Sequence, residues 1–172
     1  MTISDITEDA ILGGRLRIRQ PRRGYRVNVD TLLLAAAVEA LPGARLMEAG
    51  CGVGAAMLAV AVRRATTAWL GLERDQNIAS IARENVAANA MSARAEIVTG
   101  DALDKRANWG VFDGVFVNPP FDADGEGRPP GEHRRYAHVT EAPIAAWIAA
   151  LADRVEKAGL YAYRDRKNKK RT

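Results

Sequence analysis

A short apolar stretch that runs into a glycine-rich turn and then into an apolar helical pattern constrains the fold of this chain most. Residues 44–49 predict a strand, Gly50, Gly52 and Gly54 follow, and residues 55–64 predict a helix. Glycines at this place allow a tight turn and a close approach of the backbone to a ligand. About twenty residues further on, a second apolar strand ends in Glu73, where a carboxylate can accept both hydrogen bonds of a ribose diol.

Strand-like and helix-like segments alternate along most of the chain. A helix over about 31–41, which Asn28 or Asp30 can cap, ends at Pro42 and Gly43. Further strands are expected at about 44–49, 67–73, 94–99, 111–117 and 158–163, and helices at 55–64, 75–89 and 143–157. This alternation predicts an α/β fold with a mainly parallel sheet and right-handed crossovers. We expect an amino-terminal arm with a hairpin (1–30), the α/β domain (31–164) and a disordered basic tail (165–172).

The sequence Asn118-Pro119-Pro120-Phe121 directly follows the apolar run 111–117. Ligands of open α/β sheets bind at the carboxyl ends of such strands. The two prolines make the turn rigid and fix its carbonyl groups, and Asn118 adds a side-chain oxygen acceptor. Two acceptors beside the flat ring of Phe121 could hold an exocyclic amine such as N6 of adenine. The simpler interpretation is a Pro-Pro turn that only ends a strand.

The glycine turn, the spaced acid and the Asn-Pro-Pro-Phe motif together resemble class I S-adenosylmethionine-dependent methyltransferases, and the motif resembles those that methylate exocyclic or amide nitrogens. Residues 12–21 and 24–34 are similar to bacterial tRNA (adenine-N6)-methyltransferases that act beside the valine anticodon. The resemblance extends to about residue 155. It implies a Rossmann-like sheet, S-adenosylmethionine as cofactor, and transfer of a methyl group to N6 of an adenine in tRNA.

The resemblance also implies functional residues along the arm and the strand ends. Those implied for cofactor binding are Tyr25, Arg26, Asp30, Glu48, Gly50, Cys51, Gly52, Gly54, Glu73, Arg74, Asp101, Ala102 and Asn118. The transfer itself would depend on Asn118, Pro119, Pro120 and Phe121. Three of the acids also have a simpler interpretation: Asp30 as a helix cap, Asp101 as a turn residue, and Glu48 as a solvated acid at a strand end.

Basic residues gather near both ends of the chain, which carries a net charge of +4 and has a pI of about 9.5. In the strand 15–19, Leu16 and Ile18 point to one side and the three arginines to the other. That arginine face could meet RNA phosphates, or it could be an edge strand whose charges prevent aggregation. The residues expected to contact RNA are Arg15, Arg17, Arg19, Arg22, Arg23, Arg134 and Arg135.

Composition excludes several other classes of protein. No apolar run reaches the ~20 residues that span a bilayer, and the acidic amino terminus is not a signal peptide. The single cysteine, Cys51, excludes an internal disulfide and predicts a cytoplasmic protein. The two histidines, His133 and His138, lack further ligands in register, so we expect no metal site.

The carboxyl end departs from the family that the chain resembles. The family continues with a fifth strand, another helix and a strand hairpin, whereas here a charged tail follows residue 163. We therefore expect missing or incomplete final strands, and an exposed sheet edge that could pair with a second copy.

Several functional alternatives stay open. The substrate could be guanine N2 of rRNA or a protein glutamine, and the short form could bind cofactor or RNA without turnover. A dinucleotide-binding oxidoreductase would also satisfy Gly50-x-Gly52-x-x-Ala55, but it leaves the Asn-Pro-Pro-Phe motif unexplained.

Overall fold

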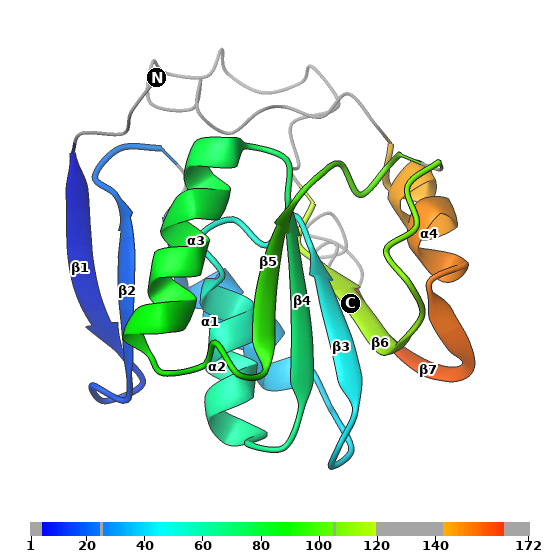
Figure 1. Cartoon of the computed structure of the whole chain (residues 1–172), viewed down its shortest axis with the longest axis horizontal. Coiled ribbons are helices and arrows are strands. Elements are labelled where there is room, and N and C mark those ends of the chain that lie inside the picture. Colours follow the sequence, from blue (N-terminus) through cyan, green and yellow to red (C-terminus); the bar gives the residue numbers. More distant parts are fainter. Residues whose placement is uncertain (1–4, 25, 105, 120–142, 164–172) are drawn as a thin grey trace, which may run out of the picture.

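A computed structural model describes residues 5–24, 26–104, 106–119 and 143–163 (Figure 1). Five strands form one sheet in the order β5-β4-β3-β6-β7, and every neighbouring pair in it is parallel. The strands are β3 (Arg45–Ala49), β4 (Ala68–Glu73), β5 (Ala95–Thr99), β6 (Phe112–Val117) and β7 (Val155–Tyr163). The helices are α1 (Val29–Ala37), α2 (Ala55–Arg63), α3 (Gln76–Ala88) and α4 (Ile144–Ala152). This arrangement confirms the predicted Rossmann-like α/β fold.

Side chains from alternate positions of the central strands fill two cores, one on each face of the sheet. Leu46 of β3 and Phe116 of β6 belong to the core shared with α1, α2, α3 and the arm. Met47 and Val115, one position away, belong to the second core, which includes Trp147 of α4. Burial on both faces explains why these strands appear in the sequence as continuous apolar runs.

The amino-terminal arm is a separate two-stranded antiparallel sheet of β1 (Ile6–Ile11) and β2 (Leu16–Pro21). Its turn places Leu12, Gly13 and Gly14 at positive φ, which glycine adopts without strain. Leu16 and Ile18 are fully buried, which confirms that this side of the strand docks on the core. The arm lies beside α3, at the left of the molecule in Figure 1.

Two predicted boundaries were wrong. The helix expected at 31–41 spans Val29–Ala37, because Arg63 of α2 donates to the carbonyls of Ala35 and Val38 and thereby satisfies the end of α1. Asn28 forms its capping box, so Asn28 rather than Asp30 is the cap.

The helix expected at 143–157 ends at Ala152, and β7 begins at Val155 rather than at residue 158. The backbone N–H of Phe112 donates to the carbonyl of Arg154 at 2.9 Å, which starts the ladder between β6 and β7. Pairing with β6 therefore ends the helix that the sequence predicted to continue past Ala152.

Candidate active site

The carboxyl ends of the central strands bring the predicted site residues into one row. Ala49 lies opposite Val117 on one side and opposite Leu72 on the other. The residues that come next, Asn118, Gly50 and Glu73, are therefore neighbours across the sheet. Adjacent strands are about 4.8 Å apart, so a ligand of nucleotide size placed over Gly50 reaches both the amide and the carboxylate.

The glycine turn after β3 has a backbone that requires glycine. Gly50, Gly52 and Gly54 have φ angles of 66°, 57° and 81°. Side chains are strained in this left-handed region. Gly54 is the N-cap of α2 and has no side chain to cap it, so α2 begins directly after the turn with backbone N–H groups that the cap residue does not bind. Such a helix start favours a ligand with acceptor atoms.

Glu48 is buried under the start of α2, with 3% of its surface exposed. Its Oε2 accepts a hydrogen bond from the backbone N–H of Met57 at 2.9 Å. Burial is the main cause that raises the pKa of Glu48 to about 8; the nearby charge of Glu73 acts in the same direction, and the Met57 hydrogen bond acts against it. Glu48 is therefore not the solvated strand-end acid of the simpler interpretation.

Glu73 ties the glycine turn to the start of α3. Its Oε2 accepts from the backbone N–H of Gly52 at 3.0 Å, and its Oε1 accepts from the backbone N–H of Asp75 at 2.9 Å. Each carboxylate oxygen can accept a second hydrogen bond, so ribose hydroxyls could still bind. The sequence suggested the ribose role alone and gave no sign of this structural one. The next residue, Arg74, is exposed.

Asp101 and Ala102 follow β5 in a tight turn. Asp101 is exposed, and its Oδ1 accepts from the backbone N–H of Leu103 at 2.9 Å. Asp101 therefore stabilises the turn, as the simpler interpretation predicted. Ala102 is buried. Trp109 packs so closely on Gly100 that a Cβ atom there would lie 2.4 Å from the indole ring.

Cys51 fills the space between the glycine turn and β4. It is buried, and a Cβ atom on Gly71 would lie 2.9 Å from its Sγ. Burial raises the pKa of the thiol well above its usual value, and the charges of Glu48 and Glu73 act in the same direction. A thiol held neutral in this way is a packing group rather than a nucleophile.

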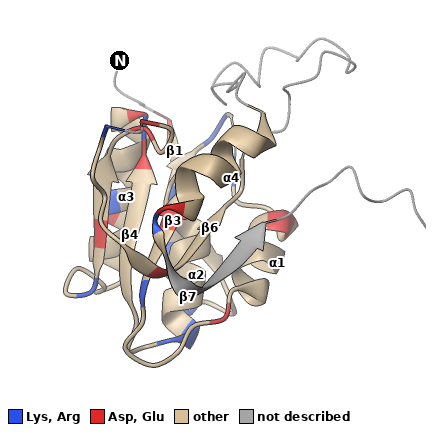
Figure 2. Cartoon of the chain, turned by 90° about the vertical axis from the view of Figure 1, so that its right-hand side faces the viewer, with Lys and Arg blue, Asp and Glu red and all other residues tan. Residues whose placement is uncertain are grey.

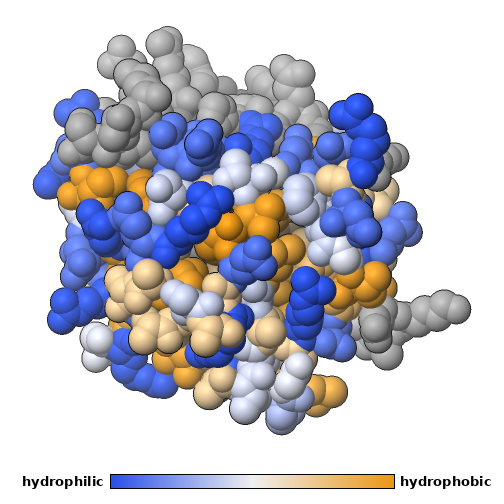
Figure 3. Space-filling model, in the orientation of Figure 1, coloured by the Kyte–Doolittle hydropathy of each residue, from blue (hydrophilic) through white to orange (hydrophobic). Residues whose placement is uncertain are grey.

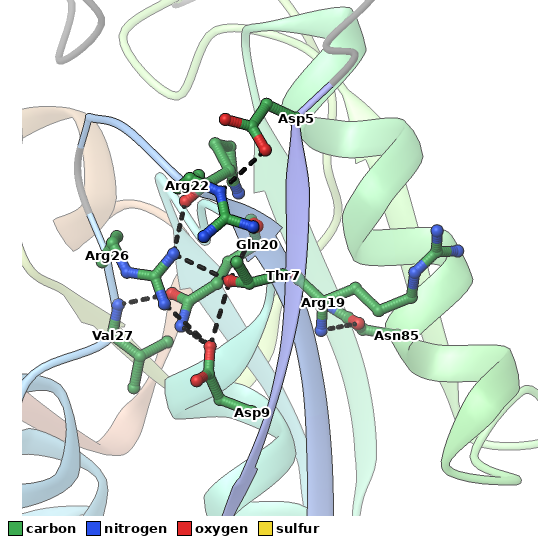
Figure 4. A network of polar contacts seen from close by, with 10 residues as sticks. Asp5, Thr7, Asp9, Arg19, Gln20, Arg22, Arg26, Val27 and Asn85 are labelled. Carbon is green, nitrogen blue, oxygen red and sulfur yellow. Dashed lines mark hydrogen bonds and ion pairs between the residues drawn. The ribbon is translucent and has the colours of Figure 1, made fainter.

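Arg26, predicted to close the cofactor pocket, is held in a polar network within the arm (Figure 4). Its guanidinium donates to Asp9 at 2.8 Å, to the hydroxyl of Thr7 at 2.8 Å and to the carbonyl of Pro21 at 2.7 Å. Gln20 is buried, donates to Asp9 at 2.7 Å, and accepts from the backbone N–H of Val27 at 2.9 Å. The network fixes the path of the chain from β2 toward α1.

The hydrogen bonds of this network also stabilise the charged form of its acid. The hydrogen bond from Gln20 is the largest of the contacts that lower the pKa of Asp9, followed by those from Thr7 and Arg26. Desolvation opposes them. Asp9 is therefore the anionic partner of Arg26 at neutral pH.

Acidic partners accompany several arginines of the arm. Arg17 pairs with Glu8 at 3.4 Å, Arg22 pairs with Asp5 at 2.8 Å, and Arg19 pairs with Glu84 of α3. Basic and acidic segments accordingly lie close together near β1 in Figure 2. Hydrophilic side chains line the left rim of the face in Figure 3, where β1 and β2 lie. Arg15 and Arg23 are exposed. The arm therefore carries arginines that could bind a ligand, but the paired ones would have to break their ion pair with a carboxylate first.

Some predicted residues lie outside the described part of the chain: Tyr25, Pro120, Phe121, Arg134, Arg135 and the tail 165–172. Asn118 is half-buried and Pro119 is buried at the end of β6. Asp30 is half-buried in the first turn of α1.

One neighbour of the site carried no recognisable sequence signal. A Cβ atom on Gly50 would lie 3.8 Å from the ring of Trp147, which α4 brings to the site from 97 positions along the chain. The indole Nε1 of Trp147 is buried and has no hydrogen-bond partner among the described residues.

The described ranges contain neither a cluster of metal ligands nor a helix that could span a membrane. Those residues contain no group of three or more His, Cys, Asp or Glu side chains able to hold a metal ion. Among the same residues, no helix combines the length and apolar character needed to cross a membrane.

Comparison with known proteins identifies the family. Residues 25–131, more than half of the chain, match the family model of the methyltransferase small domain. The chain belongs to this family. The match spans α1, the glycine turn, Glu73 and Asn118, and so includes the row of strand ends described above.

Relatives of the chain are named for different substrates. The chain is 28% identical over 137 residues to the tRNA1(Val) (adenine(37)-N6)-methyltransferase of Bacteroides thetaiotaomicron, with 79% of this chain and 57% of that protein covered. It is 33% identical over 104 residues to the release factor glutamine methyltransferase of Agrobacterium fabrum, with 59% of this chain and 35% of that protein covered. The chain thus spans between about a third and somewhat more than half of these relatives.

A solved structure supports the fold assignment. A SAM-dependent methyltransferase from Thiobacillus denitrificans, in complex with S-adenosyl-L-homocysteine, superposes with a TM-score of 0.59 at 18% identity. The alignment covers 81% of this chain and 50% of that one. S-Adenosylmethionine, the cofactor expected from the sequence, is thus the cofactor class of a protein with the same fold.

Proposed function

We propose that this domain transfers a methyl group from S-adenosylmethionine to an exocyclic amine, namely N6 of an adenine in tRNA. The observation that carries the proposal is the strand register, which makes Asn118 a neighbour of Gly50 and Gly50 a neighbour of Glu73. One bound cofactor could therefore touch the glycine turn and the acid while its reactive end faces Asn118.

The residues at the strand ends fit this cofactor. The glycine turn offers backbone close to a ligand, and the buried carboxyl of Glu48 beneath it could become an anionic partner for the cofactor's ammonium group. Glu73 would accept from the ribose hydroxyls, and Asp101 would accept from the adenine amine. When bound, S-adenosylmethionine would supply a methyl group on a sulfonium; a nitrogen lone pair can take this group while the carbon–sulfur bond breaks and its electron pair stays on sulfur, which leaves S-adenosylhomocysteine.

Asn118 and Pro119 would prepare the substrate nitrogen. The lone pair of an exocyclic amine is delocalised into the base, so the nitrogen attacks poorly unless its geometry changes. The side-chain oxygen of Asn118 and the carbonyl of Pro119 would accept its two N–H groups and direct the lone pair toward the methyl carbon. Ideal positioning of this kind is worth up to about 7–11 kcal/mol. The nitrogen then loses a proton, which water can accept because a protonated aromatic amine is strongly acidic.

Removal of the Asn118 amide tests the assignment. We expect Asn118→Ala to lower methyl transfer to a tRNA transcript by at least ~100-fold, because a preorganised acceptor contributes on that order. The affinity for S-adenosylmethionine, measured by calorimetry, should stay within about twofold. Transfer is followed with radiolabelled cofactor, and digestion to nucleosides identifies N6-methyladenosine. An equal loss of cofactor binding and transfer would contradict the role of Asn118.

The tRNA substrate is supported by the arm and can be tested separately. Replacing Arg15, Arg17 and Arg19 by Glu should raise the Kd for tRNA at least ~10-fold and reduce the salt dependence of binding. Cofactor affinity should not change, because these side chains lie on the far side of β2 from the buried Leu16 and Ile18. Methylation of a glutamine-containing release factor, with no transfer to tRNA, would instead identify the protein-modifying alternative.

A further inference from the structure

Two asparagines on α3 bind the backbone of the arginine strand β2. The Oδ1 of Asn85 accepts from the backbone N–H of Arg19 at 2.8 Å, and its Nδ2 donates to the carbonyl of the same residue at 2.9 Å (Figure 4). In the same way, the Oδ1 of Asn89 accepts from the backbone N–H of Arg17 at 3.0 Å, and its Nδ2 donates to the carbonyl of Arg17 at 2.7 Å. Each side-chain amide thus exchanges both hydrogen bonds with one residue, as a neighbouring strand would.

The spacing explains why a helix can serve as this neighbour. Residues four apart on a helix are separated by about 6 Å along its axis, and residues two apart on a strand by about 6.8 Å. Asn85 and Asn89 therefore match Arg19 and Arg17 in register. One edge of β2 pairs with β1, and the amide groups occupy the other, so the position of the arm is set by α3.

Each amide makes one further hydrogen bond, and the partners differ. The Nδ2 of Asn89 donates to the carbonyl of Asn85 at 2.8 Å, within α3. The Nδ2 of Asn85 donates to the carbonyl of Val53 at 2.9 Å, inside the glycine turn between Gly52 and Gly54. Asn85 is fully buried. A single amide therefore holds the turn that would carry the cofactor and the strand that would carry the RNA-binding arginines.

We propose that Asn85 is a positioning residue that couples cofactor binding at the glycine turn to RNA binding by the arm. This inference rests on the proposed function. When a ligand orders the turn, the carbonyl of Val53 holds the Asn85 amide, and the amide in turn holds β2. Ordering of one partner therefore lowers the cost of ordering the other, and the effect is reciprocal.

Unmodified protein provides the first test. The Kd of S-adenosylhomocysteine is measured by calorimetry with and without saturating tRNA transcript, and the Kd of tRNA with and without S-adenosylhomocysteine, at one fixed salt concentration. We expect each ligand to lower the Kd of the other by the same factor, of about fivefold or more. If methyl is transferred to tRNA but neither ligand changes the Kd of the other, the coupling is overturned and the proposed function stays intact. Absence of both binding and transfer would overturn both.

Matched variants assign the coupling to Asn85. Asn85→Ala and Asn89→Ala each remove one amide from β2, and both should weaken tRNA binding. Only Asn85→Ala removes the bond to Val53, so only this variant should raise the cofactor Kd, by about fivefold or more, and bring the coupling factor toward one. Equal cofactor affinities in the two variants would overturn the assignment. Should Asn85→Ala fail to fold, hydrogen exchange decides: cofactor should slow exchange of the Arg19 amide in unmodified protein, and an unchanged rate would overturn the coupling.

Discussion

The buried carboxyl of Glu48 makes the stability of this domain depend on pH in an unusual direction. Most acids have lowered pKa values in folded proteins, but burial raises that of Glu48 from 4.5 to about 8. Above pH 4.5 the unfolded chain loses this proton while the folded chain keeps it. The unfolded state then binds fewer protons, so the free energy of unfolding falls as the pH rises through this window. Above pH 8 both states are ionised at Glu48, and its contribution becomes constant.

The size of the effect follows from the two pKa values. Each pKa unit corresponds to about 1.4 kcal/mol, so the rise from 4.5 to about 8 corresponds to roughly 5 kcal/mol of lost stability between acidic and alkaline pH. That is a large part of the free energy of unfolding of a small domain, which is roughly 5–15 kcal/mol. Without cofactor, the domain should therefore have a markedly lower free energy of unfolding at pH 8.5 than the titration of its exposed acids alone would give.

Glu48→Gln isolates this contribution. Glutamine keeps an oxygen that can accept from the backbone N–H of Met57 but has no proton to lose in this range. Urea unfolding of both proteins is measured from pH 5 to pH 9 at constant ionic strength. The stability of the variant relative to the original protein should rise by roughly 4 kcal/mol across this range, since part of the full effect lies below pH 5. A difference that stays constant within about 0.5 kcal/mol would refute the conclusion that the folded carboxyl is neutral.

Cofactor binding should reverse the protonation of the same carboxyl. If an ammonium group binds beside Glu48, its charge favours the carboxylate, and binding at pH 7 should release up to one proton. Calorimetry in buffers of different ionisation enthalpy measures this release. Glu48→Gln should release none, and equal release by both proteins would show that the proton comes from another group.

Two further substitutions test the surroundings of the site. Gly100→Ala should destabilise the fold by about 1–3 kcal/mol in urea unfolding, because the new Cβ atom would lie 2.4 Å from Trp109. The backbone of Gly100 is not left-handed, so adding Trp109→Leu should recover part of the loss. No recovery would contradict the steric cause. Glu73→Ala should weaken cofactor binding at least ~10-fold by calorimetry, since it removes a ribose acceptor and frees the N–H of Gly52; unchanged affinity would exclude Glu73 from the site.

Local sequence patterns were sufficient for the main features of the fold. The alternation of apolar strands and helices predicted the parallel sheet, because strands buried on both faces need apolar residues at every position. The period of two in Arg15–Arg19 correctly placed Leu16 and Ile18 in the core. The positive φ angles of Gly50, Gly52 and Gly54 match the tight turn expected from their spacing. These features depend on backbone sterics and hydrophobic burial within a few residues.

Boundaries set by distant contacts could not be predicted in this way. The helix after Pro143 was predicted to run to residue 157, but β7 begins at Val155 because its backbone pairs with β6. Likewise, α1 ends early because Arg63 of α2 contacts its last carbonyls. In both places a long-range hydrogen bond determined where local propensity stopped.

The sequence by itself determined which chemical groups are available: a glycine turn, a spaced acid, and an amide followed by prolines. Only the tertiary structure decided which of them meet. The strand order places Asn118, Gly50 and Glu73 in one row although they are up to 68 residues apart. It also buries Glu48, commits Arg26 to the arm, and brings Asn85 against both β2 and Val53. Partners of this kind are fixed by strand pairing and helix packing, which act between segments that no local pattern connects.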